Sequence, residues 1–268
     1  MSYVNGYLNY TGSKYKLLEQ ILPQMDYTKD YFVDLFAGSM VVSANIIDKY
    51  EKILINDIIE DVIGIHKSVI DNDDIIEIVK VLSNVKDDQD AYNKLRESYN
   101  IKKTPEKLWA LILSCNSNLM RFNKNGEFNQ TWGRRGFNKN TQKNIDIFTE
   151  RVRPHKNKII FTSKNFNDIK IHKPSMVYMD PPYSNTSAGY NLQWNVDNDI
   201  KLYNYCKNLD KNGTSFMLSG VLLHNGVRCV LLDKLISDGF RYKELNFDYN
   251  KVSKKGKKET KEIIIMNY

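Results

Sequence analysis

The sequence predicts an α/β fold built on a doubly wound, mostly parallel sheet. The apolar run Tyr31–Phe36 stops at a glycine turn, Ala37-Gly38-Ser39, and the helical periodicity of Met40–Tyr50 follows it. A second apolar run, Lys52–Ile55, then ends in Asn56-Asp57. This order of strand, turn, helix, strand and acid opens a doubly wound sheet. Later apolar runs read as further buried strands: Lys158–Thr162, Ser175–Met179, Ser215–Ser219 and Lys261–Met266.

Between the second and third of these strands lies a segment of different character. Ile58–Asn100 shows helical patterns rich in Asp and Lys, and Glu106–Met120 is strongly amphipathic. Asn125-Gly126 is a strong hairpin signal, because both residues tolerate a positive φ. We therefore expect a mainly helical insertion with a β-hairpin at residues 58–145, and a core formed by residues 1–57 and 146–268.

The composition narrows the class of protein. The 268 residues carry 39 Lys and Arg against 32 Asp and Glu, a net charge of +7 that favours a polyanionic partner. The cysteines lack paired spacing and the histidines are scattered, so neither a disulfide framework nor a metal site is expected. The N-terminus is too polar for a signal peptide, and no apolar stretch approaches the roughly 20 residues of a membrane span. We expect a reduced, cytoplasmic protein.

The sharpest local signal is Asp180-Pro181-Pro182-Tyr183, directly after the strand Ser175–Met179. Two prolines make a stiff loop at a strand end, where sheet proteins bind ligands. Asp180 and the Pro181 carbonyl can each accept one hydrogen of an exocyclic amine, and Tyr183 can stack on the ring that carries it. Such acceptors draw the nitrogen lone pair out of conjugation and make the nitrogen nucleophilic. The structural alternative is a proline turn with a capping Asp.

The glycine turn after the first strand is the second signal. Gly38 permits close approach of the backbone to a ligand, and the following helix N-terminus favours a carboxylate. Asp57, after the next strand, suits a ribose diol. A glycine turn with an Asp cap would look similar.

Together these motifs resemble the Dam family of DNA adenine-N6 methyltransferases, especially its small phage-type members, over nearly the whole chain. Besides the glycine turn, Asn56-Asp57 and the Asp-Pro-Pro-Tyr motif, several segments carry the resemblance in the family's order: Tyr10–Lys14 (YTGSK), Lys158–Phe166 (KIIFTSKNF), Tyr190-Asn191 with Trp194, and Lys261–Asn267 (KEIIIMN). The glycine turn lacks the family's second glycine and has Met40 there.

The resemblance implies a methyltransferase core that takes S-adenosylmethionine (SAM). The implied catalytic residues are Asp180, Pro181, Pro182 and Tyr183. The implied cofactor residues are Tyr10, Thr11, Gly12, Lys14, Asp34, Phe36, Ala37, Gly38, Ser39, Asp57, Asn165, Phe166 and Asp180. The activity implied is transfer of a methyl group to N6 of an adenine flipped out of duplex DNA, without a metal.

The hairpin resembles the family's DNA-reading element, and Arg135 resembles its arginine just beyond. A two-stranded ribbon fits the major groove, where Arg reads guanine and Asn or Gln reads adenine. The DNA-binding residues expected are Lys14, Asn118, Met120, Arg121, Asn123, Asn129, Gln130, Thr131, Arg134, Arg135, Asn138 and Tyr190. GATC or a related short site is implied. The chain departs from the GATC-reading members, because Thr131-Trp132 stands where they have proline and phenylalanine.

Other interpretations stay open on the residues alone. The lysine-rich run Lys251–Lys261 either faces DNA phosphate or is a solvated loop. Some ribosomal-RNA guanine methyltransferases carry the same Asp-Pro-Pro-Tyr motif, but the long helical insertion favours DNA. Asp180 favours adenine over cytosine N4, and a cytosine-C5 enzyme would need a Pro-Cys that the chain lacks. A catalytically silent DNA-binding module would have no use for the motif. We expect a monomer or weak dimer on double-stranded DNA, in a restriction-modification or phage setting.

Overall fold

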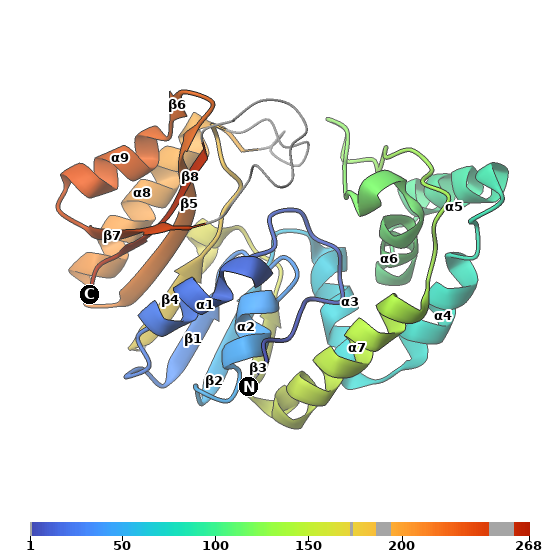
Figure 1. The fold of residues 1–268 in the computed structure, drawn as a ribbon, viewed down its shortest axis with the longest axis horizontal. Helices are drawn as coiled ribbons and strands as arrows, with labels where there is room; N and C mark the ends of the chain where they lie inside the picture. Colours follow the sequence, from blue (N-terminus) through green and yellow to red (C-terminus); the bar gives the residue numbers. More distant parts are fainter. Residues whose placement is uncertain (1, 172–173, 186–193, 247–259) are drawn as a thin grey trace.

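The computed structural model describes residues 2–171, 174–185, 194–246 and 260–268, and within them the chain forms an eight-stranded sheet flanked by helices (Figure 1). The strand order is β3-β2-β1-β4-β5-β8-β7, with β6 paired to β5. From β3 to β5 all pairs are parallel, whereas β8 is antiparallel to both of its neighbours. The predicted α/β fold with a mostly parallel sheet is confirmed. The strands are β1 (Tyr31–Asp34), β2 (Lys52–Asn56), β3 (Ile159–Thr162), β4 (Ser175–Met179), β5 (Ser215–His224), β6 (Val227–Arg228), β7 (Arg241–Leu245) and β8 (Thr260–Met266).

Helices cover both faces of the sheet, because strand side chains alternate between two apolar clusters. Met176 and Tyr178 on β4 belong to the cluster that contains the buried residues of α1 (Leu18–Ile21) and α2 (Val41–Ile46). Val177 and Met179 belong to the cluster of α8 (Val196–Lys211) and α9 (Val230–Ser237). None of the helices in these residue ranges has the length and apolar character of a membrane span.

The segment between β2 and β3 forms five further helices within the described residues. They are α3 (Glu60–Asp71), α4 (Asp74–Leu82), α5 (Gln89–Ile101), α6 (Pro105–Ser114) and α7 (Lys139–Val152). Helix α6 packs against α3, α4 and α5, while α3 also contacts β3 and α7 contacts α2. Figure 1 accordingly shows α4, α5 and α6 set apart from the sheet, with α3 and α7 between them and the strands.

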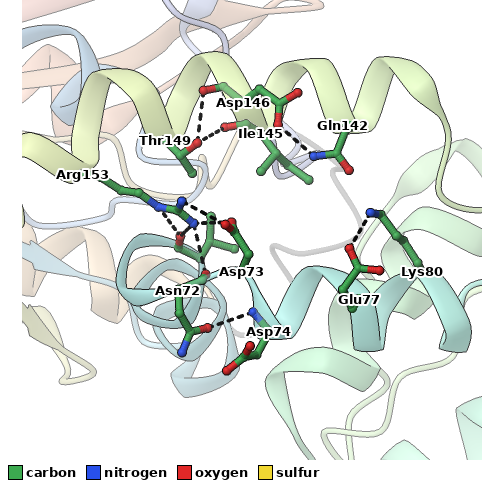
Figure 2. A network of polar contacts seen from close by, with 11 residues as sticks. Asn72, Asp73, Asp74, Glu77, Lys80, Gln142, Ile145, Asp146, Thr149 and Arg153 are labelled. Carbon is green, nitrogen blue, oxygen red and sulfur yellow. Dashed lines mark hydrogen bonds and ion pairs between the residues drawn. The ribbon is translucent and has the colours of Figure 1, made fainter.

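Arg153 ties the end of α7 to the end of α3 (Figure 2). Its guanidinium donates to the carbonyl of Val69 at 2.8 and 3.2 Å and to that of Asn72 at 3.1 Å, and it forms an ion pair with Asp73. The last carbonyls of a helix have no partner within the helix, so an arginine is a suitable cap. Arg153 thereby joins the first and the last helix of the segment between β2 and β3.

The helix predicted at Glu106–Met120 ends early, at Ser114, because a later segment takes over its hydrogen bonds. The Gly133 amide donates to the Ser114 carbonyl at 2.9 Å. A Cβ on Gly133 would lie 2.3 Å from the Cys115 carbonyl oxygen, so only glycine allows this approach. The helix predicted at Met40–Tyr50 is likewise shorter, since Met40 has a left-handed φ of 57° and α2 covers only Val41–Ile46.

The hairpin turn forms at the predicted dipeptide. Gly126 has a φ of 74°, and the Asn123 amide donates to the Glu127 carbonyl at 2.9 Å. The flanking residues do not form regular strands, however, because Phe122 and Phe128 pair only through an isolated bridge. The predicted two-stranded ribbon is therefore a turn with a single bridge.

Candidate active site

The site lies where the parallel strands β1, β2 and β4 end. Strand register brings Asp34 beside Tyr178, so the loops that follow β1 and β4 leave the sheet side by side. They line a cavity of about 1040 Å³. All residues predicted from the sequence as catalytic or cofactor-binding line it: Tyr10, Thr11, Gly12, Lys14, Asp34, Phe36, Ala37, Gly38, Ser39, Asp57, Asn165, Phe166, Asp180, Pro181, Pro182 and Tyr183.

The loop after β1 is fixed by hydrogen bonds and by a close contact that requires glycine. The Gly38 amide donates to Asp57 Oδ2 at 3.0 Å, which joins the ends of β1 and β2. Gly38 has a φ of 48°, and a Cβ there would lie 3.0 Å from the ring of Tyr10. Any larger residue would therefore strain the backbone and force the Tyr10 ring to shift by a few tenths of an ångström.

Asp34 carries a buried oxygen without a partner in the described structure. Its Oδ2 accepts from Ser43 Oγ at 2.5 Å, while its Oδ1 makes no hydrogen bond and the residue is 2% exposed. Burial, reinforced by the nearby charges of Asp180 and Asp57 and opposed by Ser43, raises the pKa of Asp34 to about 7. An unpaired buried acceptor is costly, and a cationic donor entering the cavity would satisfy it.

Aromatic rings form another wall of the cavity. The ring centroid of Phe36 lies 5.4 Å from that of Phe166 and 5.7 Å from that of Trp194. Trp194 is held by its indole nitrogen, which donates to Asp199 at 2.7 Å. Such a group of rings suits a planar apolar surface such as an adenine.

Asp180, which lies in the loop after β4, contacts the side chain of Lys14. The Lys14 ammonium lies 2.6 and 2.7 Å from the two carboxylate oxygens of Asp180 and 2.8 Å from the Tyr183 hydroxyl. The Tyr183 hydroxyl in turn donates to Asp180 Oδ1 at 2.7 Å. Burial lowers the pKa of Lys14, but the Asp180 and Glu262 carboxylates outweigh burial and raise it, so the ammonium stays charged.

The same cavity extends to the hairpin. Met120, Phe122 and Asn123 line it together with the loops of the sheet. Lys103 holds the turn by donating to the Gly126 carbonyl at 2.8 Å. The loop after β4 and the hairpin thus face one continuous space.

The residues predicted to read DNA occupy different environments. Arg121 donates to the Asn129 side chain at 2.9 Å, so these two brace the hairpin, and Gln130 is only 7% exposed. Arg135 donates to Asn118 Oδ1 at 2.8 Å, beside a second, smaller cavity of about 350 Å³. Thr131, Arg134 and Asn138 are exposed, Met120 is buried in the wall of the main cavity, and Tyr190 lies outside the described residues.

Sequence reasoning missed contacts that tie the site together, including one made by Asn56 of the Asn56-Asp57 motif. Asn56 donates to the carbonyls of Leu35 and Lys164, at 3.0 and 3.1 Å, and so links the loops that follow β1 and β3. His66 and Glu262 are both buried beside the site without having been singled out. Only the long-range fold brings them there. Among the described residues no group of three or more His, Cys, Asp or Glu could hold a metal ion.

Comparison with known proteins points to one family. Residues 10–252 match the model of the D12 class N6 adenine-specific DNA methyltransferases. The chain is 31% identical to the type II methyltransferase M.FokI of Planomicrobium okeanokoites over 100% of this chain and 43% of the relative. It is 28% identical to the type II methyltransferase M.MjaIII of Methanocaldococcus jannaschii over 99% of each chain.

A solved structure, the rRNA methyltransferase AviRa of Streptomyces viridochromogenes, covers 98% of this chain and 90% of its own at 7% identity, but its TM-score of 0.42 is too low to support an argument. The chain spans less than half the length of M.FokI but nearly the whole length of M.MjaIII, so these two relatives differ in length. Membership of the matched family implies S-adenosylmethionine as the methyl donor. With the family model matching nearly all of its residues, the chain belongs to the D12 class of N6 adenine-specific DNA methyltransferases.

Proposed function

We propose that this chain transfers a methyl group from S-adenosylmethionine to N6 of an adenine flipped out of a short duplex DNA site. One observation carries the proposal. The Asp180–Tyr183 loop, the glycine loop and the hairpin all line one cavity. A flipped base entering from DNA held at the hairpin would therefore meet the acceptors of Asp180 beside the methyl donor.

The residues around the glycine loop fit the cofactor, which when bound supplies an electrophilic methyl group on a sulfonium. The rings of Phe36, Phe166 and Trp194 would enclose its adenine. Asp57, which already fixes the loop, would accept from the ribose hydroxyls. The unpaired Oδ1 of Asp34 would accept from the amino group of the methionine part.

The chain's own residues then prepare the target nitrogen. Asp180 and the Pro181 carbonyl would each accept one hydrogen of the adenine amino group, while Tyr183 stacks on the base. The base has to leave the helix stack, since its amino group is otherwise out of reach of the cofactor. After transfer, the surplus proton passes to Asp180 or to solvent.

For DNA recognition we propose that residues 58–145 form the target-recognition insertion and that residues 1–57 and 146–268 form the catalytic core. Arg135 with Asn118 offers the donor and acceptor groups that read base edges, and GATC or a related site is the proposed target. Lysines and arginines of the insertion would contribute contacts to phosphate that do not depend on sequence. We place this activity in the cytoplasm, where the DNA of a bacterium or an infecting phage lies, with a monomer or weak dimer acting on DNA.

Incubation with methyl-labelled S-adenosylmethionine and a set of duplexes tests the proposal. Digestion and chromatography of the DNA should yield labelled N6-methyladenine and no labelled cytosine, and ribosomal RNA should remain unlabelled. Label in cytosine or in RNA would instead support one of the rival methyltransferase classes. Single-molecule sequencing of DNA from cells that express the chain would then give the site.

A further inference from the structure

The Lys14 ammonium lies between two carboxylates. Besides Asp180, Glu262 Oε1 lies 3.5 Å from Lys14 Nζ, and these are the ion-pair partners of Lys14 among the described residues. Lys14 is 3% exposed and Glu262 is 4% exposed. The carbonyl of Gly12 also accepts from the ammonium, at 3.1 Å. A positive charge thus lies at the position where the proposed reaction needs acceptors.

The hydrogen bonds of Asp180 show the resulting conflict. Oδ1 already accepts from both Lys14 and Tyr183, and Oδ2 accepts from Lys14. A carboxylate oxygen has about two acceptor sites, so Oδ1 is fully used. An ammonium bound to both oxygens also withdraws the electron density that Asp180 has to offer to an adenine amino group. Lys14 must therefore release part of Asp180 before the amino group can bind there.

Glu262 is placed to receive the released charge. It lies on β8, whose neighbours β5 and β7 hydrogen-bond to it on both sides, so its backbone is held in the sheet. Burying a carboxylate costs several kcal/mol unless a partner compensates it. The charge of Lys14 compensates Glu262, and Glu262 keeps Lys14 paired when Asp180 is taken by another donor.

We propose that Glu262 is a positioning residue that takes over the Lys14 ammonium when the target adenine binds Asp180. The inference rests on the proposed adenine transfer. In the free protein Lys14 fills the acceptor site of Asp180. In the complex Lys14 is held by Glu262 and the Gly12 carbonyl, and the acceptor sites of Asp180 that Lys14 had filled become available to the adenine.

Glu262→Gln tests this, because it removes the charge and keeps the shape. Labelling of adenine by the unsubstituted protein is established first, and its absence would refute the proposed function rather than this inference. For Glu262→Gln, kcat should fall at least about tenfold, since each 1.4 kcal/mol of lost stabilisation is a factor of ten. The Kd for S-adenosylmethionine should not change. Glu244→Gln, an exposed carboxylate on the neighbouring strand β7, is the matched control and should keep full activity.

A double-mutant cycle separates positioning from a general structural role. If Glu262 acts through Lys14, then Glu262→Gln should have no further effect on kcat in a Lys14→Gln background. Equal losses in both backgrounds, or an unchanged kcat in the single variant, would overturn the proposal. Thermal unfolding reports whether the variants fold. Should Glu262→Gln fail to fold, Glu262→Asp takes its place in the cycle, because its shorter side chain draws the carboxylate away from Lys14 and should lower kcat only when Lys14 is present.

Discussion

His66 Nε2 lies 2.7 Å from the carbonyl oxygen of Gly38, so a side chain of α3 holds the loop that follows β1. On its other side, His66 Nδ1 lies 2.7 Å from the Tyr7 hydroxyl. A carbonyl can only accept, so Nε2 carries the hydrogen and Nδ1 accepts from Tyr7. Burial lowers the pKa of His66 to about 4, which keeps the ring neutral. The backbone of Gly38 is thus held at its carbonyl oxygen by His66 and at its amide nitrogen by Asp57.

Two substitutions of His66 should therefore differ in cofactor affinity. Gln can place its amide nitrogen near the position of Nε2 and keep the bond to Gly38, whereas the shorter Asn cannot. A buried carbonyl left without its donor costs about 1–3 kcal/mol. For His66→Asn we expect the Kd for S-adenosylmethionine, measured by calorimetric titration, to rise about fivefold or more. His66→Gln should stay close to the unsubstituted protein.

Tyr7→Phe is the control for this pair, because it removes the other hydrogen bond of His66 and leaves the bond to Gly38 in place. Its Kd should change less than that of His66→Asn. Equal affinities for the Asn and Gln variants, both folded by thermal unfolding, would show that the bond to Gly38 does not position the cofactor loop.

Cofactor affinity should rise with pH around the pKa of Asp34. Burial raises that pKa to about 7, so the carboxyl is neutral below this pH and carries its charge above it. Only the charged form pairs with an ammonium, so the Kd should fall between about pH 6 and pH 8.

The free energy of unfolding of the cofactor-free protein should instead decrease as the pH rises. A carboxyl whose pKa is raised on folding binds more protons in the folded state than in the unfolded state. Its contribution to the free energy of unfolding is therefore present below about pH 4 and is lost as the pH rises through about 7.

Asp34→Asn should flatten both pH profiles, because the amide does not titrate. Calorimetric titrations and thermal unfolding at several pH values measure the two effects. A Kd for the unsubstituted protein that does not vary with pH would contradict the assignment of Asp34 to the ammonium group. The same assignment would be contradicted if the Kd of the Asp34→Asn variant varied with pH as it does in the unsubstituted protein.

Asp180→Asn should remove methyl transfer while leaving cofactor binding in place. The amide keeps the shape of the carboxylate but offers a single acceptor oxygen, and its nitrogen would face the Lys14 ammonium. Loss of one group that stabilises developing charge costs about 10²–10³ in kcat. Single-turnover labelling measures the rate. A variant that retained the full rate would exclude Asp180 as the acceptor of the amino group.

The strand ends that form the site could be predicted because their signals are local. Asp180-Pro181-Pro182-Tyr183 follows an apolar run within a few residues, and so does the glycine turn. Any parallel sheet brings such ends to one edge. His66 and Glu262 could not be predicted in this way, because each sits in an ordinary apolar pattern and meets the site only through the packing of α3 and the pairing of β8.

The insertion shows the same distinction between local and distant causes. The turn at Asn125-Gly126 depends on the positive φ of Gly126, 74°, whereas Asn125 does not have a positive φ, and it forms at the predicted dipeptide. The end of α6 at Ser114 depends instead on Gly133, which approaches it from beyond the hairpin. The edge strand Arg241–Leu245 was not predicted, because its mostly exposed side chains leave no apolar run in the sequence.

Arg135→Ala should weaken discrimination between DNA sites more than it weakens binding overall. Arg135 is held by Asn118, which also donates to the Ile112 carbonyl at 2.9 Å and so fixes the guanidinium relative to the end of α6. An arginine held in this way can read a guanine edge, worth about 1–3 kcal/mol of discrimination.

The neighbouring Arg134 lies over the Trp132 ring at 5.2 Å and is the matched control. For Arg134→Ala we expect a uniform loss of affinity and a smaller salt dependence, as for a phosphate contact. Methylation of a duplex library by each variant gives the site preference. A preference that changed in Arg134→Ala and not in Arg135→Ala would assign base reading to the other arginine.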